Sequence, residues 1–353
     1  MNALFEYRNT MDALRFTPEQ KAALAERAAE RAAERAGGKT RRHPLWRTAL
    51  IAACLAAALA VGAGASGVLK SAAEVFAPIF GGSAAQTEVI DKIGHPIGAG
   101  DTDNGVTITA DAIIGDQYNA AIVYTIRRDD GTALLPEGTD PRSLLMGGFG
   151  GASLDIRGGS HGSARFVADE ADSSAVQLVQ TLSADHSITG STATAEFEDL
   201  CVWDEAQETP IPVVEGHWKF RFDVDYEDAS VTLGGGETFT QNGMTFTVDA
   251  VTVSPVAVKV DYTVDSEVRW SDAPSGRLPA EDSRQMERYF ENVEILLTKT
   301  DGTVIDLSSS GGSLNPENGV TVCDKGEVFD EILPLEDLES ICVGGIAYPI
   351  SGK

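Results

Sequence analysis

The chain has 353 residues, of which 42% are hydrophobic and 23% charged, and a formal net charge of −27 at pH 7. A surface this acidic disfavours binding to nucleic acids and anionic lipids, since both are polyanions. The five histidines and four cysteines stand in no metal-ligand or catalytic-triad spacing, so we expect no catalytic, cofactor or metal site and no enzyme activity.

Residues 1–44 predict a helical cytoplasmic tail. Leu4, Tyr7, Met11 and Leu14 recur at helical spacing and form one apolar stripe. A second, alanine-rich helix follows and has few large side chains to bury. Because so short a tail cannot cover the stripe of its own first helix, we expect these four residues to bind a partner protein as a helix in a groove.

Residues 45–69 predict a transmembrane helix. Residues 48–69 carry no charge, and a helix of this length is roughly 33 Å long, enough to cross a hydrocarbon core of about 30 Å. Three alternatives remain: a buried core helix, a lipoprotein cleavage site ending at Cys54, and a signal-peptidase site at residues 63–65. A retained anchor fits best, because the apolar run continues past Cys54 and a long charged segment precedes it.

The distribution of charge along the chain predicts how this helix is oriented in the membrane. Ten basic and six acidic side chains give residues 1–47 a net charge of +4, whereas 17 basic and 48 acidic side chains give residues 48–353 a net charge of −31. The positive-inside rule then puts the N-terminus in the cytoplasm and the bulk of the chain outside. We therefore predict a single-pass protein of the cell membrane, in contact with the lipid bilayer through one helix.

The rest of the chain has the pattern of β-strands. Residues 106–109 and 218–226 alternate between apolar and polar side chains, and Asn-Gly and Asp-Gly turns separate such stretches. One further helix is predicted near residues 280–290. The predicted domains are a linker at 70–98 with a small helix near 71–76, a first β domain at 99–230 and a second at 231–353.

An internal repeat supports two domains. The segment that begins at Thr102 aligns without gaps with the one that begins at Thr240, and nine of 24 positions are identical. The identical pairs are Thr102/Thr240, Asn104/Asn242, Gly105/Gly243, Thr107/Thr245, Thr109/Thr247, Asp111/Asp249, Ala112/Ala250, Tyr124/Tyr262 and Thr125/Thr263. The mainly β fold that this predicts is two tandem Ig-like β-sandwiches. The turn at Asp130-Gly131 is matched with the one at Asp301-Gly302 at a larger offset, which implies a register slip.

Two further motifs are ambiguous. The residues from Asp101 to Gly105 resemble the start of a calcium-binding loop, but Ala112 stands where an EF-hand has a glutamate. Cys323 and Cys342 flank consecutive predicted strands, which leaves open whether they form a disulfide.

Several segments resemble a bacterial family. They are FTPEQK (residues 16–21), GHPIGAGDTDNGVTITADAIIGD (residues 94–116) and VEGHWKFRFDVDY (residues 214–226), together with the span and its basic flank. Through them the chain resembles the domain-of-unknown-function family 4179, found in anti-sigma-factor-like single-pass membrane proteins. The resemblance implies an extracytoplasmic-function sigma factor as partner and a role in transcription regulation, and it supplies no catalytic residues.

The predicted function is therefore a single-pass membrane regulator, an anti-sigma factor that links an extracytoplasmic β-rich sensor to a cytoplasmic sigma-factor-binding tail. The alternative is a membrane-anchored surface binding or adhesion module with an inert tail. The sequence does not identify the extracellular ligand.

Overall fold

The computed structural model describes residues 70–350, apart from residues 137–138, 140–143, 145–147, 157–159, 169–171, 205 and 272–278. The predicted tail and the predicted span lie outside this described part, as do Leu4, Tyr7, Met11 and Leu14. Among the residues it describes, no helix is both long and apolar enough to cross a membrane. The described residues belong to one compact unit.

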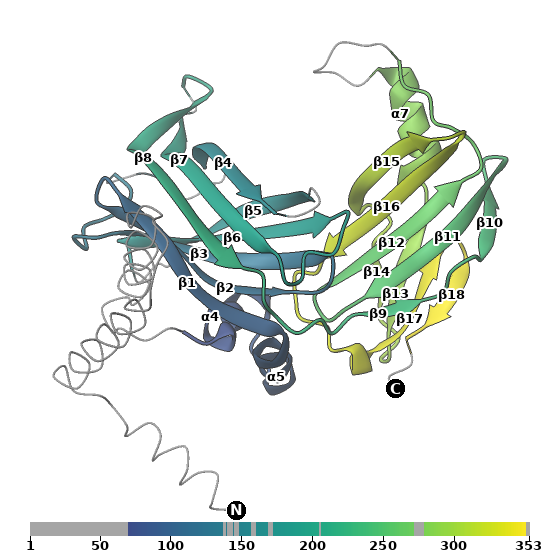
Figure 1. The fold of residues 1–353 in the computed structure, drawn as a ribbon, viewed down its shortest axis with the longest axis horizontal. Coiled ribbons are helices and arrows are strands. Elements are labelled where there is room, and N and C mark those ends of the chain that lie inside the picture. Colours follow the sequence, from purple (N-terminus) through teal and green to yellow (C-terminus); the bar gives the residue numbers. More distant parts are fainter. Residues whose placement is uncertain are drawn as a thin grey trace, which may run out of the picture. The chain divides into compact units, whose positions relative to one another are not determined.

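The fold is mainly β, and its first half contains two antiparallel sheets (Figure 1). One sheet has the strand order β1-β2-β3-β6-β5, and the other has the order β4-β7-β8. The strands are β1 (Gly94–Asp103), β2 (Val106–Gly115), β3 (Asn119–Arg128), β4 (Phe149–Asp155), β5 (Ser160–Ala168), β6 (Ala175–Ala184), β7 (Thr192–Asp204) and β8 (Thr209–Asp223).

The second half repeats this arrangement. Its larger sheet contains the order β10-β11-β12-β16-β15, with β9 also paired to β11, and its smaller sheet has the order β14-β13-β17-β18. The strands are β9 (Val231–Leu233), β10 (Thr238–Gln241), β11 (Met244–Val253), β12 (Ala257–Val264), β13 (Ile295–Lys299), β14 (Val304–Asp306), β15 (Gly311–Glu317), β16 (Val320–Val328), β17 (Leu338–Val343) and β18 (Ile346–Pro349). The predicted further helix is confirmed as α7 (Ala280–Met286), which continues into the π-helical turn η1 (Glu287–Glu291), and a 3₁₀ turn η2 (Leu335–Asp337) precedes β17.

Each half has its own hydrophobic core, and both of its sheets contribute to that core. In the first half Tyr124 of β3 packs edge-on against Phe197 of β7, with ring centroids 5.3 Å apart. In the second half Phe246 and Tyr262 pack with Leu297 of the smaller sheet. The first core extends along the chain to Tyr226. Each sheet thus buries one face in the core of its half, as the sequence pattern predicts.

The identical residues of the repeat occupy equivalent places. Asn104 and Asn242 have positive φ angles of 46° and 52°, and each is followed by a glycine at φ 75°, as the hairpin turns between β1 and β2 and between β10 and β11 require. Both β2 and β11 carry a register shift, which falls at Asp111 and at Asp249. The repeat therefore preserves the turns and bulges that set the path of the backbone.

One matched pair of turns is not equivalent. The Asp130-Gly131 turn follows β3, the third strand of its sheet, whereas Asp301-Gly302 joins β13 to β14. Among the described strands of the first half none corresponds to β14, since the smaller sheet there has three strands. The predicted register slip rests on matching these two turns. They are different connections that have a similar composition, so they give no measure of a slip.

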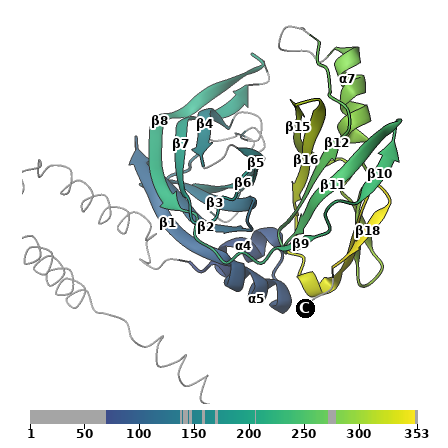
Figure 2. The ribbon, with the colours of Figure 1, turned by 45° about the vertical axis from the view of Figure 1, so that its right-hand side comes forward.

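The predicted linker at 70–98 contains two helices and the start of β1. Helix α4 (Ala72–Phe80) and helix α5 (Ala84–Ile93) each begin at a serine whose side chain forms a capping box. Phe76 and Ile90 are fully buried in a third apolar cluster, which these helices form with β2, β3 and β6. Figure 2 shows α4 and α5 next to β1 and β2. The helices cover the outer face of the first larger sheet, so this segment is part of the packed fold.

Cys201, Cys323 and Cys342 are free thiols. Cys323 faces the second core from β16, whereas the side chain of Cys342 on β17 alternates with the core residues Ile341 and Val343 and faces away from that core. Because the two thiols lie on different sides of the smaller sheet, the bridge left open by the sequence does not form. Burial raises the pKa of the Cys323 thiol to about 12.

Candidate functional site

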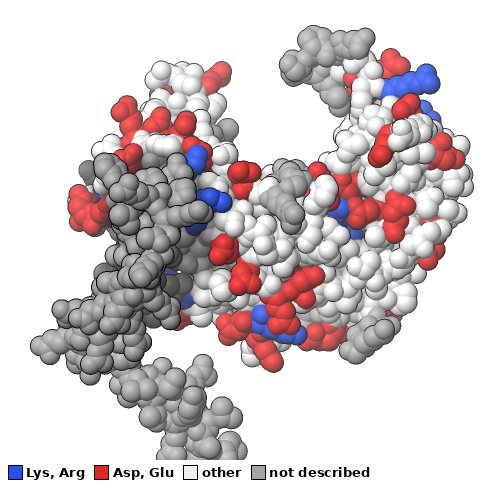
Figure 3. All heavy atoms as spheres, viewed as in Figure 1, with Lys and Arg blue, Asp and Glu red and all other residues white. Residues whose placement is uncertain are grey.

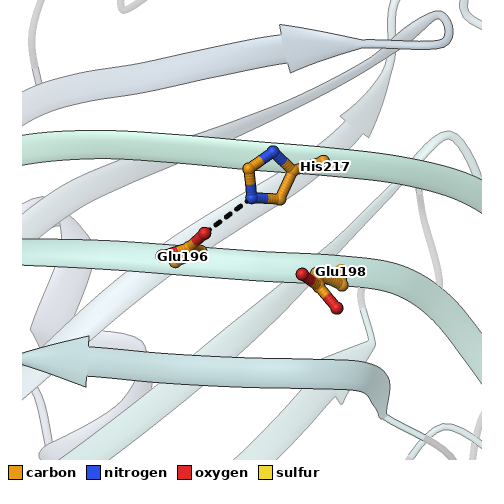
Figure 4. Close-up of side chains that lie close together, drawn as sticks. All are labelled: Glu196, Glu198 and His217. Carbon is orange, nitrogen blue, oxygen red and sulfur yellow. Dashed lines mark hydrogen bonds and ion pairs between the residues drawn. The ribbon is translucent and has the colours of Figure 1, made fainter.

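Glu196, Glu198 and His217 form one exposed cluster on the smaller sheet of the first half (Figure 4). Their ligand atoms lie within 4.8 Å of one another, and no other group of three such side chains was found in the described part of the chain. Phe197 and Trp218 alternate with them and point into the core, which explains why all three share the outer face.

The cluster is already internally paired. Glu196 Oε1 lies 2.7 Å from His217 Nε2, and Glu196 Oε2 lies 2.6 Å from Lys219 Nζ. Hydrogen bonds from Lys219 and then His217 hold the pKa of Glu196 below its ordinary value. Since both oxygens of Glu196 are occupied and one partner is a lysine, the geometry is that of a surface ion-pair network, and a metal would have to displace Lys219.

The segment that resembles a calcium-binding loop has a structural role. Asp101 Oδ2 accepts a hydrogen bond from the backbone amide of Lys219, and Asp103 Oδ2 accepts one from the amide of His217, both at 2.9 Å. Among the described strands β8 pairs only with β7, so its other edge is free of backbone pairing there. The two aspartates satisfy these donors and join β1 of one sheet to β8 of the other.

A buried carboxylate joins the two halves. Asp116 follows β2, is 1% exposed, and accepts hydrogen bonds from the backbone amides of Tyr118 and Asn119 at 2.8 Å. Its Oδ2 accepts a hydrogen bond of 2.6 Å from Ser254 Oγ in the turn between β11 and β12. Burial raises the pKa of Asp116, although the hydrogen bonds from Ser254, Tyr118 and Asn119 favour its ionised form. The Asp116 carboxylate is thus shielded from water, and hydrogen bonds from several donors compensate for the lost hydration.

This contact joins equivalent positions of the repeat. Asp116 and Ser254 are 138 residues apart, the same offset as the nine identical pairs. Each residue donates its backbone amide to the carbonyl three positions later, Asp116 to Asn119 at 2.8 Å and Ser254 to Ala257 at 2.9 Å. The two halves therefore meet through the same turn of each repeat.

The helical pair also contacts the second half. Ile332, in the connection between β16 and η2, is 2% exposed. Its backbone amide donates to the carbonyl of Phe80 at 3.1 Å, and its carbonyl accepts from Gln86 Nε2 at 3.3 Å. Val256 and Ala257 join Ile332 in the apolar cluster around α4 and α5. The two helices are therefore fixed to both halves, and we take this junction as the candidate functional site.

Sequence reasoning did not identify this junction or the exposed cluster. The predicted contact residues Leu4, Tyr7, Met11 and Leu14 lie outside the described part of the chain. Alternating side chains on β7 and β8 place Glu196, Glu198 and His217 on the same face of the sheet. The sequence predicts that they are neighbours only if the turn between the two strands, and therefore their register, is known. The repeat offset makes Asp116 and Ser254 equivalent positions, but it carries no signal that they touch.

These features define a mainly β protein built from two repeats of one strand arrangement, with a helical pair fixed to both. Residues 40–128 match the family model described as "Domain of unknown function (DUF4179)", which supports the assignment of this segment to that family. The matched segment begins just before the predicted span, includes all of it, and ends with β3. The resemblance to family 4179 that the sequence predicts is confirmed for this segment.

No curated protein matches the chain. Among solved structures, the chain is similar to one titled "The crystal structure of the conserved domain protein from Bacillus anthracis". That similarity has a TM-score of 0.43 and 17% sequence identity, and it covers 71% of this chain and 76% of the other. It is too loose to carry an argument about function.

Proposed function

We propose that the chain is a single-pass membrane regulator of the anti-sigma-factor type. In this proposal residues 1–44 bind a sigma factor in the cytoplasm, residues 45–69 cross the membrane, and the β-rich part senses the state of the envelope. The proposal assigns no catalytic activity. We also propose that each half is an Ig-like β-sandwich, which is supported by two antiparallel sheets that share one core in each half.

One observation supports the proposal most: the helices that follow the apolar segment are fastened to both halves of the β-rich part. Helix α4 begins at Ala72, directly after residues 45–69, and the cluster around α4 and α5 includes Ile332 and Val256 of the second half. A rearrangement of one half against the other would strain contacts of these helices. The junction therefore offers a route by which a change in the β-rich part reaches the membrane helix.

Surface charge is consistent with an exterior location of this part. Figure 3 shows Asp and Glu side chains spread over the visible surface, with few Lys and Arg side chains. Residues 48–353 carry the net charge of −31, whereas residues 1–47 carry +4. An anionic body repels the anionic surface of a membrane, which favours a body held off the bilayer by its anchor.

The test is affinity purification of the full-length protein from its native cells, followed by identification of bound proteins. We expect a sigma factor to be enriched with the wild type and lost from a Leu4→Ala/Leu14→Ala variant, because these substitutions remove half of the apolar stripe. An Arg8→Ala/Asp12→Ala variant changes two polar residues of the same segment and should retain the partner.

The opposite result favours the alternative, a membrane-anchored binding or adhesion module with an inert tail. In that case no sigma factor is enriched over the Leu4→Ala/Leu14→Ala variant, and deletion of residues 1–36 leaves the cellular phenotype unchanged. A transcriptional response released by the same deletion would support the regulator and count against the adhesion module.

A further inference from the structure

Three Asn-Gly pairs of the chain form tight turns, and each turn joins two neighbouring strands of a larger sheet. The pairs are Asn104-Gly105, Asn242-Gly243 and Asn318-Gly319. The third pair joins β15 to β16 at the edge of the second larger sheet (Figure 1). Its φ angles are 50° at the asparagine and 89° at the glycine, so it has the same kind of backbone turn as the other two.

An asparagine that precedes a glycine can react with its own backbone. The backbone nitrogen of the glycine attacks the side-chain carbonyl carbon of the asparagine, and a glycine obstructs this approach least because it has no Cβ. The reaction needs an asparagine amide that is free to turn toward the next residue. It also needs a glycine amide that is not engaged in a hydrogen bond. The surroundings of each turn therefore decide how fast its asparagine reacts.

The side-chain amides of two of these asparagines are held by carbonyls elsewhere in the same half. Asn104 Nδ2 donates to the carbonyl of Glu215 at 2.9 Å. Asn242 Nδ2 donates to the carbonyl of Arg288 at 3.3 Å. Because such a bond has to break before the amide can turn, these two side chains are protected from the reaction.

The side chain of Asn318 is not held in this way. The nearby Asn315 donates to Ser313 Oγ at 3.1 Å, whereas the Asn318 side chain takes part in no hydrogen bond within the described part of the chain. The backbone amide of Gly319 likewise donates to no acceptor among the described residues. Both residues are exposed, and a Cβ built on Gly319 would meet nothing within 4 Å. Both reacting groups are therefore free, and water reaches them.

The two Asp-Gly turns of the chain show the opposite arrangement. In the Asp130-Gly131 turn the carboxylate accepts a hydrogen bond from the amide of Thr132 at 2.9 Å, and the glycine amide donates to the carbonyl of Arg128 at 3.2 Å. The Asp301-Gly302 turn has both kinds of bond as well. Among the five Asn-Gly and Asp-Gly turns, Asn318-Gly319 is the one whose two reacting groups are both unbound in the described structure.

We propose that Asn318 is a site of spontaneous deamidation, and that it reacts faster than Asn104 and Asn242 in the folded protein. The Gly319 nitrogen forms a bond to Asn318 Cγ and loses its proton, and Nδ2 leaves with that proton as ammonia, which gives a cyclic succinimide. Water then opens the ring. Cleavage of the new bond to Cγ gives aspartate, and cleavage of the original peptide bond gives isoaspartate.

Either product adds a negative charge at the exposed turn. Isoaspartate also adds one methylene group to the backbone between β15 and β16, whose pairing begins directly at this turn with Glu317 and Val320. The reaction needs no co-reactant except water. This inference does not depend on the proposed function.

The test is a timed incubation of the full-length protein in detergent and mildly alkaline buffer, followed by proteolysis and mass spectrometry of the three Asn-Gly peptides. We expect Asn318 to convert at least about fivefold faster than Asn104 and Asn242, because each of those side chains first has to lose a hydrogen bond. Aspartate and isoaspartate peptides have the same mass but separate by chromatography. Both should appear, since the ring opens in two ways.

The same protein unfolded in urea is the matched control. Unfolding breaks the bonds that hold Asn104 and Asn242 but leaves all three Asn-Gly sequences intact, so the three sites should convert at similar rates. An Asn318→Gln variant keeps a side-chain amide but would have to close a larger ring. It should show no conversion at position 318, while the other two sites react as in the wild type.

Two results would overturn the proposal. The first is a folded protein in which Asn104 or Asn242 converts as fast as Asn318, which would mean that the side-chain hydrogen bonds do not protect them. The second is a folded protein in which Asn318 stays intact while the unfolded chain converts completely, which would mean that the turn itself keeps the reacting atoms apart.

Discussion

The outer faces of the two larger sheets differ although their strands are equivalent. In the first half Ala121, Val123 and Val179 lie on this face, and α4 and α5 cover Val123 and Val179 in an apolar cluster. Sheet pairing gives Lys259, Asp261 and Asp324 the corresponding positions in the second half. One repeat therefore carries apolar side chains on this face and packs helices there, whereas the other carries charged side chains, of which Lys259 and Asp324 are buried.

Both repeats retain the side chains that fix the β-bulge of their second hairpin strand. The bulge aspartate accepts a hydrogen bond from the threonine of the next strand in each half, Asp111 from Thr125 at 2.5 Å and Asp249 from Thr263 at 2.7 Å. A bulge leaves an extra residue in the strand, and this side-chain bond fixes it. The comparison teaches that identity within the repeat marks positions that fix strand geometry, while the outer face is free to change its role.

Exchange of the equivalent residues Val179 and Asp324 tests the comparison most severely. Val179→Asp places a charge under the helices and should destabilise the protein by about 4 kcal/mol or more. Asp324→Val removes an unsatisfied buried carboxylate and should change stability by less than about 1 kcal/mol. Denaturant unfolding of the full-length variants measures the change in the free energy of unfolding for each substitution. Equal changes would show that the two faces do not differ in how they tolerate charge.

The bulge aspartate of the first half, Asp111, should make stability depend on pH. Burial raises the pKa of Asp111 to about 6 from an ordinary value of 3.8, with the Thr125 hydrogen bond and the charges of Lys70 and Arg127 opposing the rise. Between these values the folded state holds a proton that the unfolded state has released, so this contribution to stability is present at pH 4 and lost as the pH rises through about 6.

Asp111→Asn should remove that loss. Relative to the wild type, the variant should gain up to about 3 kcal/mol on going from pH 4 to pH 7, measured by unfolding at several pH values. Asp249→Asn is the control, because its side chain is exposed on the equivalent bulge. A wild type and an Asp111→Asn variant with parallel pH profiles would contradict the assignment.

The shared turn at the junction predicts a smaller effect. Ser254→Ala removes a donor to Asp116 and an acceptor for the amides of Val256 and Ala257, which should cost about 1–3 kcal/mol. Hydrogen exchange at these two amides should accelerate with it. Ser173→Ala, on an exposed turn of the first half, should leave both stability and exchange unchanged.

The exposed ion pairs of the first half should contribute least. Lys219→Ala should leave the unfolding midpoint where it is, because solvent screens the pair between Lys219 and Glu196. The pKa of Glu196 should rise toward its ordinary value in this variant, since Lys219 is the main cause of its depression. Carbon NMR of the Glu196 carboxylate measures this pKa, and an unchanged value would show that His217 alone holds it down.

Much of the β architecture could be predicted from sequence. Alternation identified the strands around residues 106 and 218, and the Asn-Gly pairs identified two hairpins. Helix α5 was missed because it buries only Ile90 and Ile93, too few apolar residues for a clear helical stripe. The contact between Asp116 and Ser254 could not be predicted, since a repeat offset says which positions are equivalent but not that they touch.

The central claim is that the β-rich part and the tail lie on opposite sides of the membrane. Protease added to intact cells that express the chain with a different epitope at each end tests it most directly. We predict loss of the C-terminal epitope and survival of the N-terminal one, with loss of both only after the cells are opened. A mature product released into the medium, beginning near residue 66, would contradict the account.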